Sequence, residues 1–178
     1  MKTLTVTNKR VQFYLTYSTE KPGTARKKQR LKQLEGELEK QNIMIDELFP
    51  AKQLQVLDYL LYITSGTGIA KVGAERIAEK CGCSVRTVYS AVKALKQTNE
   101  FIVARLIKSR GGAGKYVLVD KKHSNFNEIM AEVFMLSAEK VAQLNSEQFA
   151  EQNKSQPLGT HGVEGNKTTS NLNNYLKH

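Results

Sequence analysis

Apolar and polar residues alternate in two short runs near the N-terminus, residues 3–7 (TLTVT) and 11–17 (VQFYLTY). Both runs are rich in β-branched and aromatic residues, which favour extended structure. They predict two short strands joined through the polar residues 8–10, and a Pro-Gly pair at 22–23 then breaks the pattern. We therefore expect an N-terminal arm over residues 1–23 that is built on this strand pair.

Apolar residues recur at heptad spacing over residues 24–48, which predicts an amphipathic helix with a basic first half and an acidic second half. Gln41 interrupts the apolar seam, and Gly36 weakens the helix. Two uses of the seam remain open: it packs on its own domain, or it pairs with a second copy of the chain. The seam consists of Leu31, Leu34, Leu38, Ile45 and Leu48.

The main domain is expected over residues 50–122 and begins with a helix over residues 51–63. The apolar residues of this helix cover more than half of its circumference, so it should be largely buried. Pro50 suits the first turn of a helix, where a backbone N–H has no partner to lose. The Ser-Gly-Thr-Gly sequence at 65–68 predicts a loop after it.

Two further helices are predicted on either side of Gly82. The first covers residues 74–81, and Gly82 stands where a chain that leaves a helix often takes a positive φ. Ser84 is a suitable N-cap for the second helix, over residues 84–97. The core face of the second helix follows helical spacing and consists of Val88, Val92 and Leu95.

The glycine-rich stretch KSRGGAGKY, residues 108–116, allows two interpretations. Lys115 and the glycine before it match the end of a phosphate-binding loop, whereas Ser109 replaces its first glycine and Tyr116 replaces the hydroxyl residue that would ligate Mg²⁺. Such a loop also needs a helix after it. Here β-rich runs stand on both sides, at 101–107 and 116–120, so we interpret the stretch as the tip of a hairpin. A nucleotide-hydrolysing enzyme is the alternative.

The C-terminal part is expected to contain two helices and a tail. Apolar spacing predicts one helix over residues 126–136, and Ser137 caps a second that extends to about residue 152. Residues 123–152 therefore form the C-terminal helices. Residues 153–178 are rich in Asn, Gln, Ser, Thr and Gly and cannot bury a core, so we expect a disordered tail.

Charge is concentrated in the middle of the chain. The chain of 178 residues has a formal net charge of +10. Residues 51–122 hold 13 Lys+Arg against 5 Asp+Glu, a net +8, whereas residues 1–50 carry +4 and residues 123–178 carry −2. A basic domain of this kind is the electrostatic footprint of a protein that binds polyanions such as nucleic acid.

Several classes of site are not indicated. Cys81 and Cys83 are too close for a disulfide framework or a zinc knuckle, so we expect both to be small buried apolar residues. The three histidines are scattered, and no paired carboxylates or Ser-His-Asp set stands out. No run approaches the roughly 20 apolar residues of a membrane span, and the N-terminus lacks the apolar core of a signal peptide. We therefore expect a cytoplasmic protein without metal, cofactor or membrane partner.

The second predicted helix has a polar face that carries charge of one sign. With the core face inward, the opposite face presents Arg86, Ser90, Lys93 and Gln97, flanked by Thr87 and Tyr89. A solvated face normally mixes acidic and basic residues, and this face has no carboxylate. Arginine can bind a guanine edge or a phosphate through its planar fork, and serine and threonine donate to phosphates. The helix is therefore a candidate for DNA contact.

Residues 74–97 resemble a helix-turn-helix, and the flanking elements make residues 51–120 similar to a winged helix-turn-helix domain. The match lies in Ile77-Ala78 on the first helix, CGCS at 81–84 in the turn, and RTVY at 86–89 at the start of the second helix. The segments NKRVQFYLTYS and DELFPAKQLQVLDYLLY look similar to small helix-turn-helix proteins of plasmids and prophages of Gram-positive bacteria. The resemblance implies a mainly α fold with a small β-hairpin wing, an α+β class.

This resemblance implies a sequence-specific binder of double-stranded DNA, with its second helix in the major groove and its wing on the backbone or in the minor groove. A transcription regulator of a plasmid or prophage, associated with the nucleoid or plasmid, is the first expectation. A plasmid replication or partition protein is the alternative, and a protein-interaction adaptor is the second alternative. No enzymatic activity and no small-molecule substrate are expected. A homodimer is expected, through the 31–48 seam or the helix at 126–134.

The residues expected at DNA fall into three groups. On the second helix they are Ser84, Arg86, Thr87, Tyr89, Ser90 and Lys93. On the wing they are Lys108, Ser109, Arg110 and Lys115, of which Arg110 is the side chain expected to enter the minor groove. Further phosphate contacts are expected from the basic start of the 24–48 helix if that helix lies beside the DNA, namely Arg26, Lys27, Lys28 and Arg30.

Overall fold

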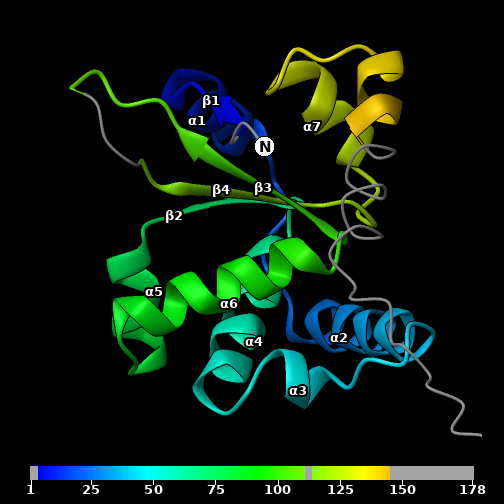
Figure 1. The fold of residues 1–178 in the computed structure, drawn as a ribbon. Coiled ribbons are helices and arrows are strands. Elements are labelled where there is room, and N and C mark those ends of the chain that lie inside the picture. Colours follow the sequence, from blue (N-terminus) through cyan, green and yellow to red (C-terminus); the bar gives the residue numbers. More distant parts are fainter. Residues whose placement is uncertain (1–3, 111–113, 145–178) are drawn as a thin grey trace, which may run out of the picture.

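A mixed α+β architecture surrounds one small sheet (Figure 1). The computed structural model describes residues 4–110 and 114–144. Four strands pair in the order β1-β3-β4-β2, with β1 parallel to β3 and the other two pairings antiparallel. The strands are β1 (Thr5–Val6), β2 (Ile69–Val72), β3 (Phe101–Leu106) and β4 (Tyr116–Asp120). The helices are α1 (Asn8–Tyr17), α2 (Thr24–Glu39), α3 (Ile45–Leu48), α4 (Lys52–Thr64), α5 (Ala74–Cys81), α6 (Val85–Gln97) and α7 (Phe126–Glu132). The expected class, mainly helical with a small sheet, is confirmed.

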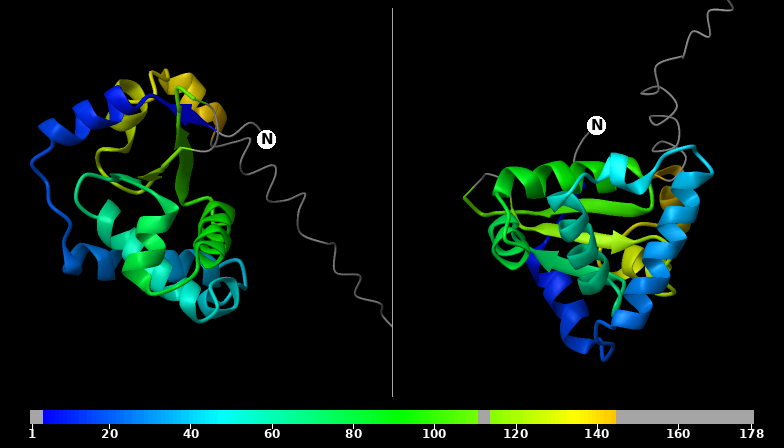
Figure 2. Two further views of the ribbon diagram at one scale, coloured as in Figure 1. Left: turned by 90° about the vertical axis from the view of Figure 1, so that its left-hand side faces the viewer. Right: turned by 90° about the horizontal axis from the view of Figure 1, so that it is seen from below.

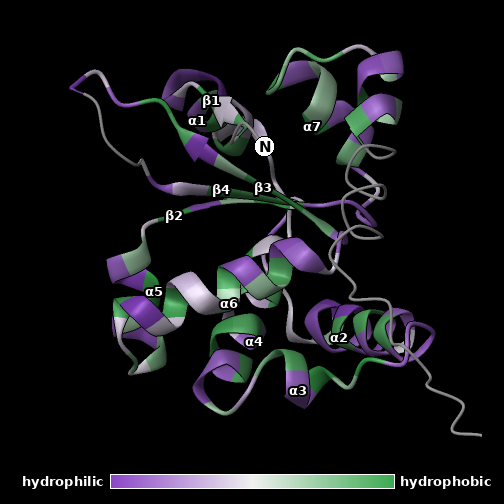
Figure 3. Cartoon of the chain, viewed as in Figure 1, coloured by the Kyte–Doolittle hydropathy of each residue, from purple (hydrophilic) through white to green (hydrophobic). Residues whose placement is uncertain are grey.

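The sheet separates two hydrophobic cores. All residues of β4 are buried, and alternate side chains enter opposite cores: Tyr116 and Leu118 on one side, Val117 and Val119 on the other. This alternation follows from the two-residue period of a strand. The first core lies among the sheet, α2, α4, α5 and α6, and the second lies among the sheet, α1 and α7 (Figures 1 and 3). With helices on both faces, β4 is hydrophobic from Tyr116 to Val119 rather than alternating with polar residues.

The predicted strand at 11–17 is wrong, because these residues lie in α1. The run contains a period of two, but Val11, Tyr14 and Leu15 also recur at helical spacing, and a short run does not distinguish the two periods. Val11 and Tyr14 are buried in the second core, whereas Phe13 and Tyr17 point outward with 63% and 71% of their surface exposed. Burial on a helical face therefore outweighs the β-propensity of the run.

The helix predicted over residues 24–48 ends early. α2 stops at Glu39, and the chain then turns through Asn42, whose φ is 57°. The N–H of Ile43 donates to the carbonyl of Leu38 at 3.0 Å, which closes the helix with a C-terminal motif that asparagine tolerates. The two ends of the apolar seam therefore lie on separate helices, α2 and α3.

The apolar seam of α2 is buried within the chain itself. Leu34 and Leu38 are almost fully buried in the first core, and Leu31 packs partly against it. The apolar face of α7 is likewise turned into the second core, since Phe126, Ile129 and Met130 are buried there. The surfaces expected to form a homodimer interface are thus largely occupied. The homodimer itself stays a prediction.

Strand β2 was not expected from the sequence. Residues 69–72 are four residues long, stand between two glycines and include a lysine, which is too short a pattern to separate from a loop. The strand forms because β4 offers an unpaired edge, with Ile69 opposite Val119 and Val72 opposite Tyr116. Residues 51–72 therefore contribute a strand of the sheet as well as α4.

The two helices around Gly82 form as predicted. Gly82 has φ 58°, and the N–H of Cys83 donates to the carbonyl of Ala78 at 3.0 Å to end α5. Ser84 caps α6, because its hydroxyl accepts the N–H of Thr87 at 3.1 Å. The predicted core face of α6 is buried at Val88, Val92 and Leu95.

The cysteines and the C-terminal helices differ in detail from the expectations. Cys81 and Cys83 are free thiols that are half-buried rather than fully buried, and burial raises the pKa of the Cys81 thiol. α7 ends at Glu132, short of the expected residue 136. A further helical segment begins at 138, where the Ser137 hydroxyl accepts the N–H of Lys140 at 3.4 Å, and continues to 144. The expected tail lies outside the described residues.

A buried ion cluster connects α2 to the far end of the sheet. Arg30 is 7% exposed, and its Nε contacts both carboxylate oxygens of Asp120, at 2.8 and 2.9 Å. Its Nη2 donates to Glu100 at 2.9 Å, and its guanidinium lies 5.2 Å from the ring centroid of Phe101. Asp120 ends β4, and Glu100 stands between α6 and β3. One side chain therefore joins three segments that are distant in sequence.

We expect Arg30→Ala to lower the free energy of unfolding by about 3–5 kcal/mol, because it leaves the buried carboxylate of Asp120 without its cation. Urea denaturation monitored by circular dichroism measures the change. Lys40→Ala is the control, since Lys40 pairs with Glu37 on the exposed end of the same segment and should change stability little. Equal effects of the two substitutions would contradict the importance of the buried cluster.

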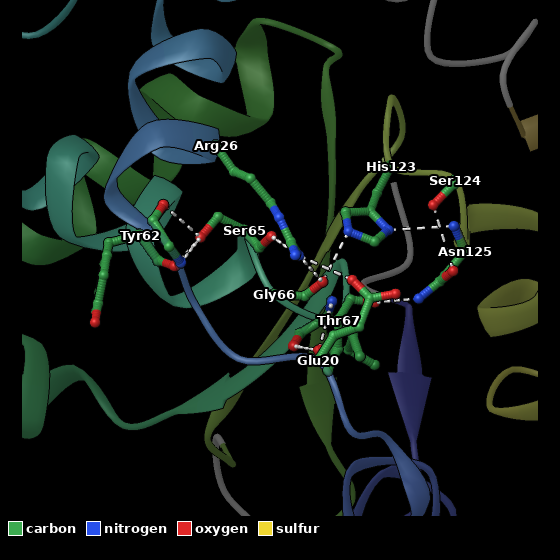
Figure 4. A network of polar contacts seen from close by, with 11 residues as sticks. Glu20, Arg26, Tyr62, Ser65, Gly66, Thr67, His123, Ser124 and Asn125 are labelled. Carbon is green, nitrogen blue, oxygen red and sulfur yellow. Dashed lines mark hydrogen bonds and ion pairs between the residues drawn. The ribbon is translucent and has the colours of Figure 1, made fainter.

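The loop after α4 is a second place where segments that are distant in sequence are joined (Figure 4). The N–H of Asn125 donates to Nδ1 of His123 at 3.2 Å, so Nε2 carries the proton and donates to the carbonyl of Gly66 at 2.9 Å. On the other side of the loop, the Ser65 hydroxyl accepts the N–H of Gly23 at 3.0 Å. The residues before α2 and those after β4 are thus held against one buried loop.

Gly68 in this loop has no room for a side chain. Its φ is 82°, and an added Cβ would stand 2.6 Å from the His123 ring. Gly82 has φ 58° and open space at the same position. We expect Gly82→Ala to cost about 1 kcal/mol of stability, and Gly68→Ala to cost about 1–3 kcal/mol more, because the ring must move. Urea denaturation of both variants tests this, and equal effects would contradict the steric argument.

Candidate nucleic-acid interface

The polar face of α6 is exposed as the sequence predicted. Arg86, Ser90, Lys93 and Gln97 are all exposed, and Tyr89 has 49% of its surface accessible. The helix contains no acidic residue. Within residues 4–110 and 114–144, the side chains of Arg86 and Lys93 form no hydrogen bond or ion pair. Both cations are therefore available to an anion from outside the chain.

The hydroxyls at the start of α6 serve the helix itself. The Ser84 hydroxyl accepts the Thr87 N–H, and the two side-chain oxygens lie 2.9 Å apart. Both residues were expected to contact DNA. The structure gives them a capping role, which was predicted for Ser84, satisfies one of the free N–H groups of the first turn and sets the direction in which α6 begins. Their contact with DNA stays a prediction.

The connection between β3 and β4 places further cations near this helix. Lys108, Ser109, Arg110 and Lys115 are exposed, and the three residues 111–113 between them lie outside the described residues. The hairpin is closed at its base, where the N–H of Leu106 donates to the carbonyl of Lys115 at 3.0 Å. Gly114 is required there, because an added Cβ would collide with the carbonyl of Leu106.

The hairpin and the N-terminal end of α6 lie on the same side of the molecule. That side is on the left in Figure 1 and faces the viewer in the left-hand view of Figure 2. Burial raises the pKa of the phenol of Tyr116, the first residue of β4, and Tyr89 on α6 adds to that rise. The start of α6 and the hairpin thus lie on one side of the molecule, and α5 lies on that side as well (Figure 1).

The structure around residues 108–116 does not fit the alternative of a phosphate-binding loop. A strand begins at Tyr116, so no helix N-terminus follows the loop to supply amide groups to a phosphate. The Tyr116 side chain is buried in the first core and is not a ligand of the kind that Mg²⁺ requires in such loops.

The basic start of α2 is engaged elsewhere. Arg30 is buried in the ion cluster with Asp120 and Glu100, so its expected contact with DNA is wrong. Lys27 pairs with Asp58 at 2.7 Å, and Arg26 pairs with Glu20 at 2.9 Å. Lys28 is exposed. In Figures 1 and 2, α2 and the hairpin lie at opposite sides of the molecule, so α2 does not extend the α6 surface.

Arg105 is a cation of this surface that sequence reasoning missed. It is the residue before the last in β3, and its guanidinium lies 3.5 Å from the ring centroid of Tyr116. Its Nη1 donates to the carbonyl of Gly114 at 2.9 Å. The two-residue period of β3 is the sequence signal for Arg105. It places Arg105 on the same face of the strand as Phe101 and Val103, which pack in the first core.

Other kinds of site are not found in the part of the chain that the structure describes. No group of His, Cys, Asp and Glu there could hold a metal ion. Among the described residues, no helix combines the length and apolar character that crossing a membrane requires. A groove of about 790 Å³ lies between α1 and α7 and is lined by Thr7, Lys9, Arg10, Phe13, Tyr14 and Glu132. It does not adjoin the α6 surface.

Comparisons with known proteins found no match, whether to protein-family models, to curated proteins or to solved structures. Any function must therefore be argued from the residues and geometry of this chain.

Proposed function

We propose that the protein binds double-stranded DNA sequence-specifically through a winged helix-turn-helix domain, in which α5 and α6 are the two helices and the β3–β4 hairpin is the wing. The observation that carries the proposal is the exposed face of α6, where Arg86 and Lys93 have no carboxylate partner among the described residues. The hairpin, which also carries exposed cations, lies on the same side of the molecule as the start of α6. An exposed helix face whose charge is of one positive sign suits the negatively charged groove of DNA.

The order of elements supports this assignment. The sequence of elements α4, β2, α5, α6, β3 and β4, with β2, β4 and β3 as neighbours in one sheet, is that of a winged helix. In the proposed complex α6 lies in the major groove. Arg86, Tyr89, Ser90 and Lys93 face base edges and nearby phosphates. The wing lies along the backbone or in the adjacent minor groove, with Arg110 the side chain that enters it.

A transcription regulator of a plasmid or prophage is the biological role we propose, with the protein in the cytoplasm and associated with the nucleoid or plasmid. A replication or partition protein would use the same surface. Mapping of binding sites across the host genome separates the two roles, because a regulator occupies promoters and a replication or partition protein occupies clustered repeats at an origin.

The contribution of α6 to sequence preference can be tested by selection of duplexes from a random pool. The wild-type chain should enrich one site. Arg86→Ala or Lys93→Ala should bind that site more weakly, by ~1–3 kcal/mol for each bidentate hydrogen-bond pair with a base that the substitution removes. Lys40→Ala, on the opposite side of the molecule, is the control and should enrich the same site as wild type. If the α6 variants retain the wild-type preference, α6 does not contact the bases.

The contribution of the wing can be measured through the salt dependence of binding. Lys115→Gln should weaken binding to selected and random duplexes alike, because a phosphate contact carries no sequence information. Fluorescence anisotropy should show the slope of log K against log salt reduced by about 0.9, the value for one phosphate contact. The matched variant Lys40→Gln should leave the slope unchanged. A slope equal to that of wild type in Lys115→Gln would exclude this lysine from the interface.

A further inference from the structure

Arg105 lies where the recognition helix and the hairpin meet. It pairs across the sheet with Tyr116, and it follows Phe101 and Val103 on the side of β3 that faces the helices. Leu106, the next residue, packs in the opposite core. The guanidinium therefore emerges on the α6 side of the sheet, at the base of the hairpin, and Arg105 is partly exposed there.

Two contacts hold the Arg105 guanidinium in one orientation. The ring of Tyr116 lies under it, with 3.5 Å between the guanidinium carbon and the ring centroid. The carbonyl of Gly114 accepts one N–H of the guanidinium at 2.9 Å. Tyr116 is itself buried, so it forms a rigid base for the stack. An arginine oriented in this way loses little conformational entropy when it binds an anion.

The charge of Arg105 is not neutralised by a carboxylate. Arg30 provides a direct contrast, because both arginines stand over an aromatic ring on the same side of the sheet. Arg30 is surrounded by Asp120 and Glu100, whereas the described residues form no ion pair with Arg105. The hydrogen-bond partner of Arg105 is a neutral carbonyl. The fold therefore leaves a positive charge beside the exposed face of α6.

The neighbours of Arg105 belong to the proposed interface. Arg105 stacks on Tyr116. Burial raises the pKa of Tyr116, Arg105 opposes that rise, and Tyr89 and Glu75 add to it, so both act electrostatically on the same phenol. Tyr89 is on the exposed face of α6. Glu75 is a carboxylate in the first turn of α5. Glu75 and Lys115 both approach Gly73.

We propose that Arg105 is a phosphate-binding residue that contacts a phosphodiester of the DNA backbone between the part read by α6 and the part bound by the hairpin. This inference rests on the proposed function. The planar guanidinium fork matches two oxygens of a phosphate group, and stacking on Tyr116 directs its free edge outward. The site requires no metal and no movement of the sheet.

Arg105→Met removes the charge and keeps much of the side-chain volume. With a short random-sequence duplex, its slope of log K against log salt should be smaller than that of wild type by about 0.9. Between 50 and 200 mM salt, the wild-type chain should therefore lose roughly 3–4-fold more affinity than the variant. Arg105→Lys keeps the charge and should retain the wild-type slope with weaker binding. An unchanged slope in Arg105→Met overturns the inference.

A purely structural role for Arg105 gives a different result. If Arg105 only braces the hairpin, its removal acts through Lys108, Arg110 and Lys115. In a background where these three are replaced by glutamine, Arg105→Met would then change nothing further. We expect the additional decrease of about 0.9 in the slope to persist in that background. Its disappearance would overturn the inference in favour of bracing.

A control and a folding measurement complete the experiment. Lys71→Met removes a cation from β2 whose side chain contacts Asn8 and Gln12, and it should leave the slope unchanged. Thermal unfolding shows whether Arg105→Met is folded at the assay temperature, and if it is not, the Arg105→Gln variant replaces it in the same comparison. Failure of the wild-type chain to bind any duplex would instead refute the proposed function.

Discussion

The buried contact between Arg30 and Asp120 is the constraint on which the arrangement of the chain depends. Three segments separated by up to 90 residues meet at this guanidinium: α2, the turn between α6 and β3, and the end of β4. A buried arginine is costly unless carboxylates surround it, and a buried carboxylate is costly without its cation. Each partner therefore fixes the place of the others. The pairing also commits α2 to the C-terminal end of α6, and Leu34 and Leu38 can then fill the first core.

The chain contains cations that are neutralised within the fold and cations that are not. At the C-terminal end of α6, the carboxylates of Glu100 and Asp120 neutralise Arg30, and burial lowers the pKa of the neighbouring Lys121 to about 8. Arg86 in the first turn of α6, Lys93 further along the helix and Arg105 near the end of β3 have no such partners among the described residues. Exposed cations without acidic partners are what an electrostatic interface with a polyanion requires.

The elements that sequence analysis placed correctly are those with local signals. Gly82 ends α5 and Ser84 begins α6 through contacts with residues a few positions away, so a short window contains the whole cause. The errors have non-local causes. Residues 11–17 fit two periods, and only the space beside the sheet selects the helical one. Strand β2 exists because β4 has a free edge. Arg30 looks like a surface cation in a basic run, and its true partners stand 70 and 90 residues away.

The same distinction between local and non-local causes applies to the residues of the candidate interface. Arg86 and Lys93 follow from the period of one amphipathic helix, and Ser84 follows from its position as N-cap, whereas the contact of the Thr87 hydroxyl with Ser84 is seen only in the structure. Arg105 required knowledge of which face of β3 is inward, and that depends on its pairing with β4. Arg30 and Arg105 occupy similar positions over aromatic rings on one side of the same sheet. What separates them is the presence or absence of carboxylates brought in by the rest of the fold. The first is therefore a structural ion, and the second carries a charge that no carboxylate of the described residues neutralises.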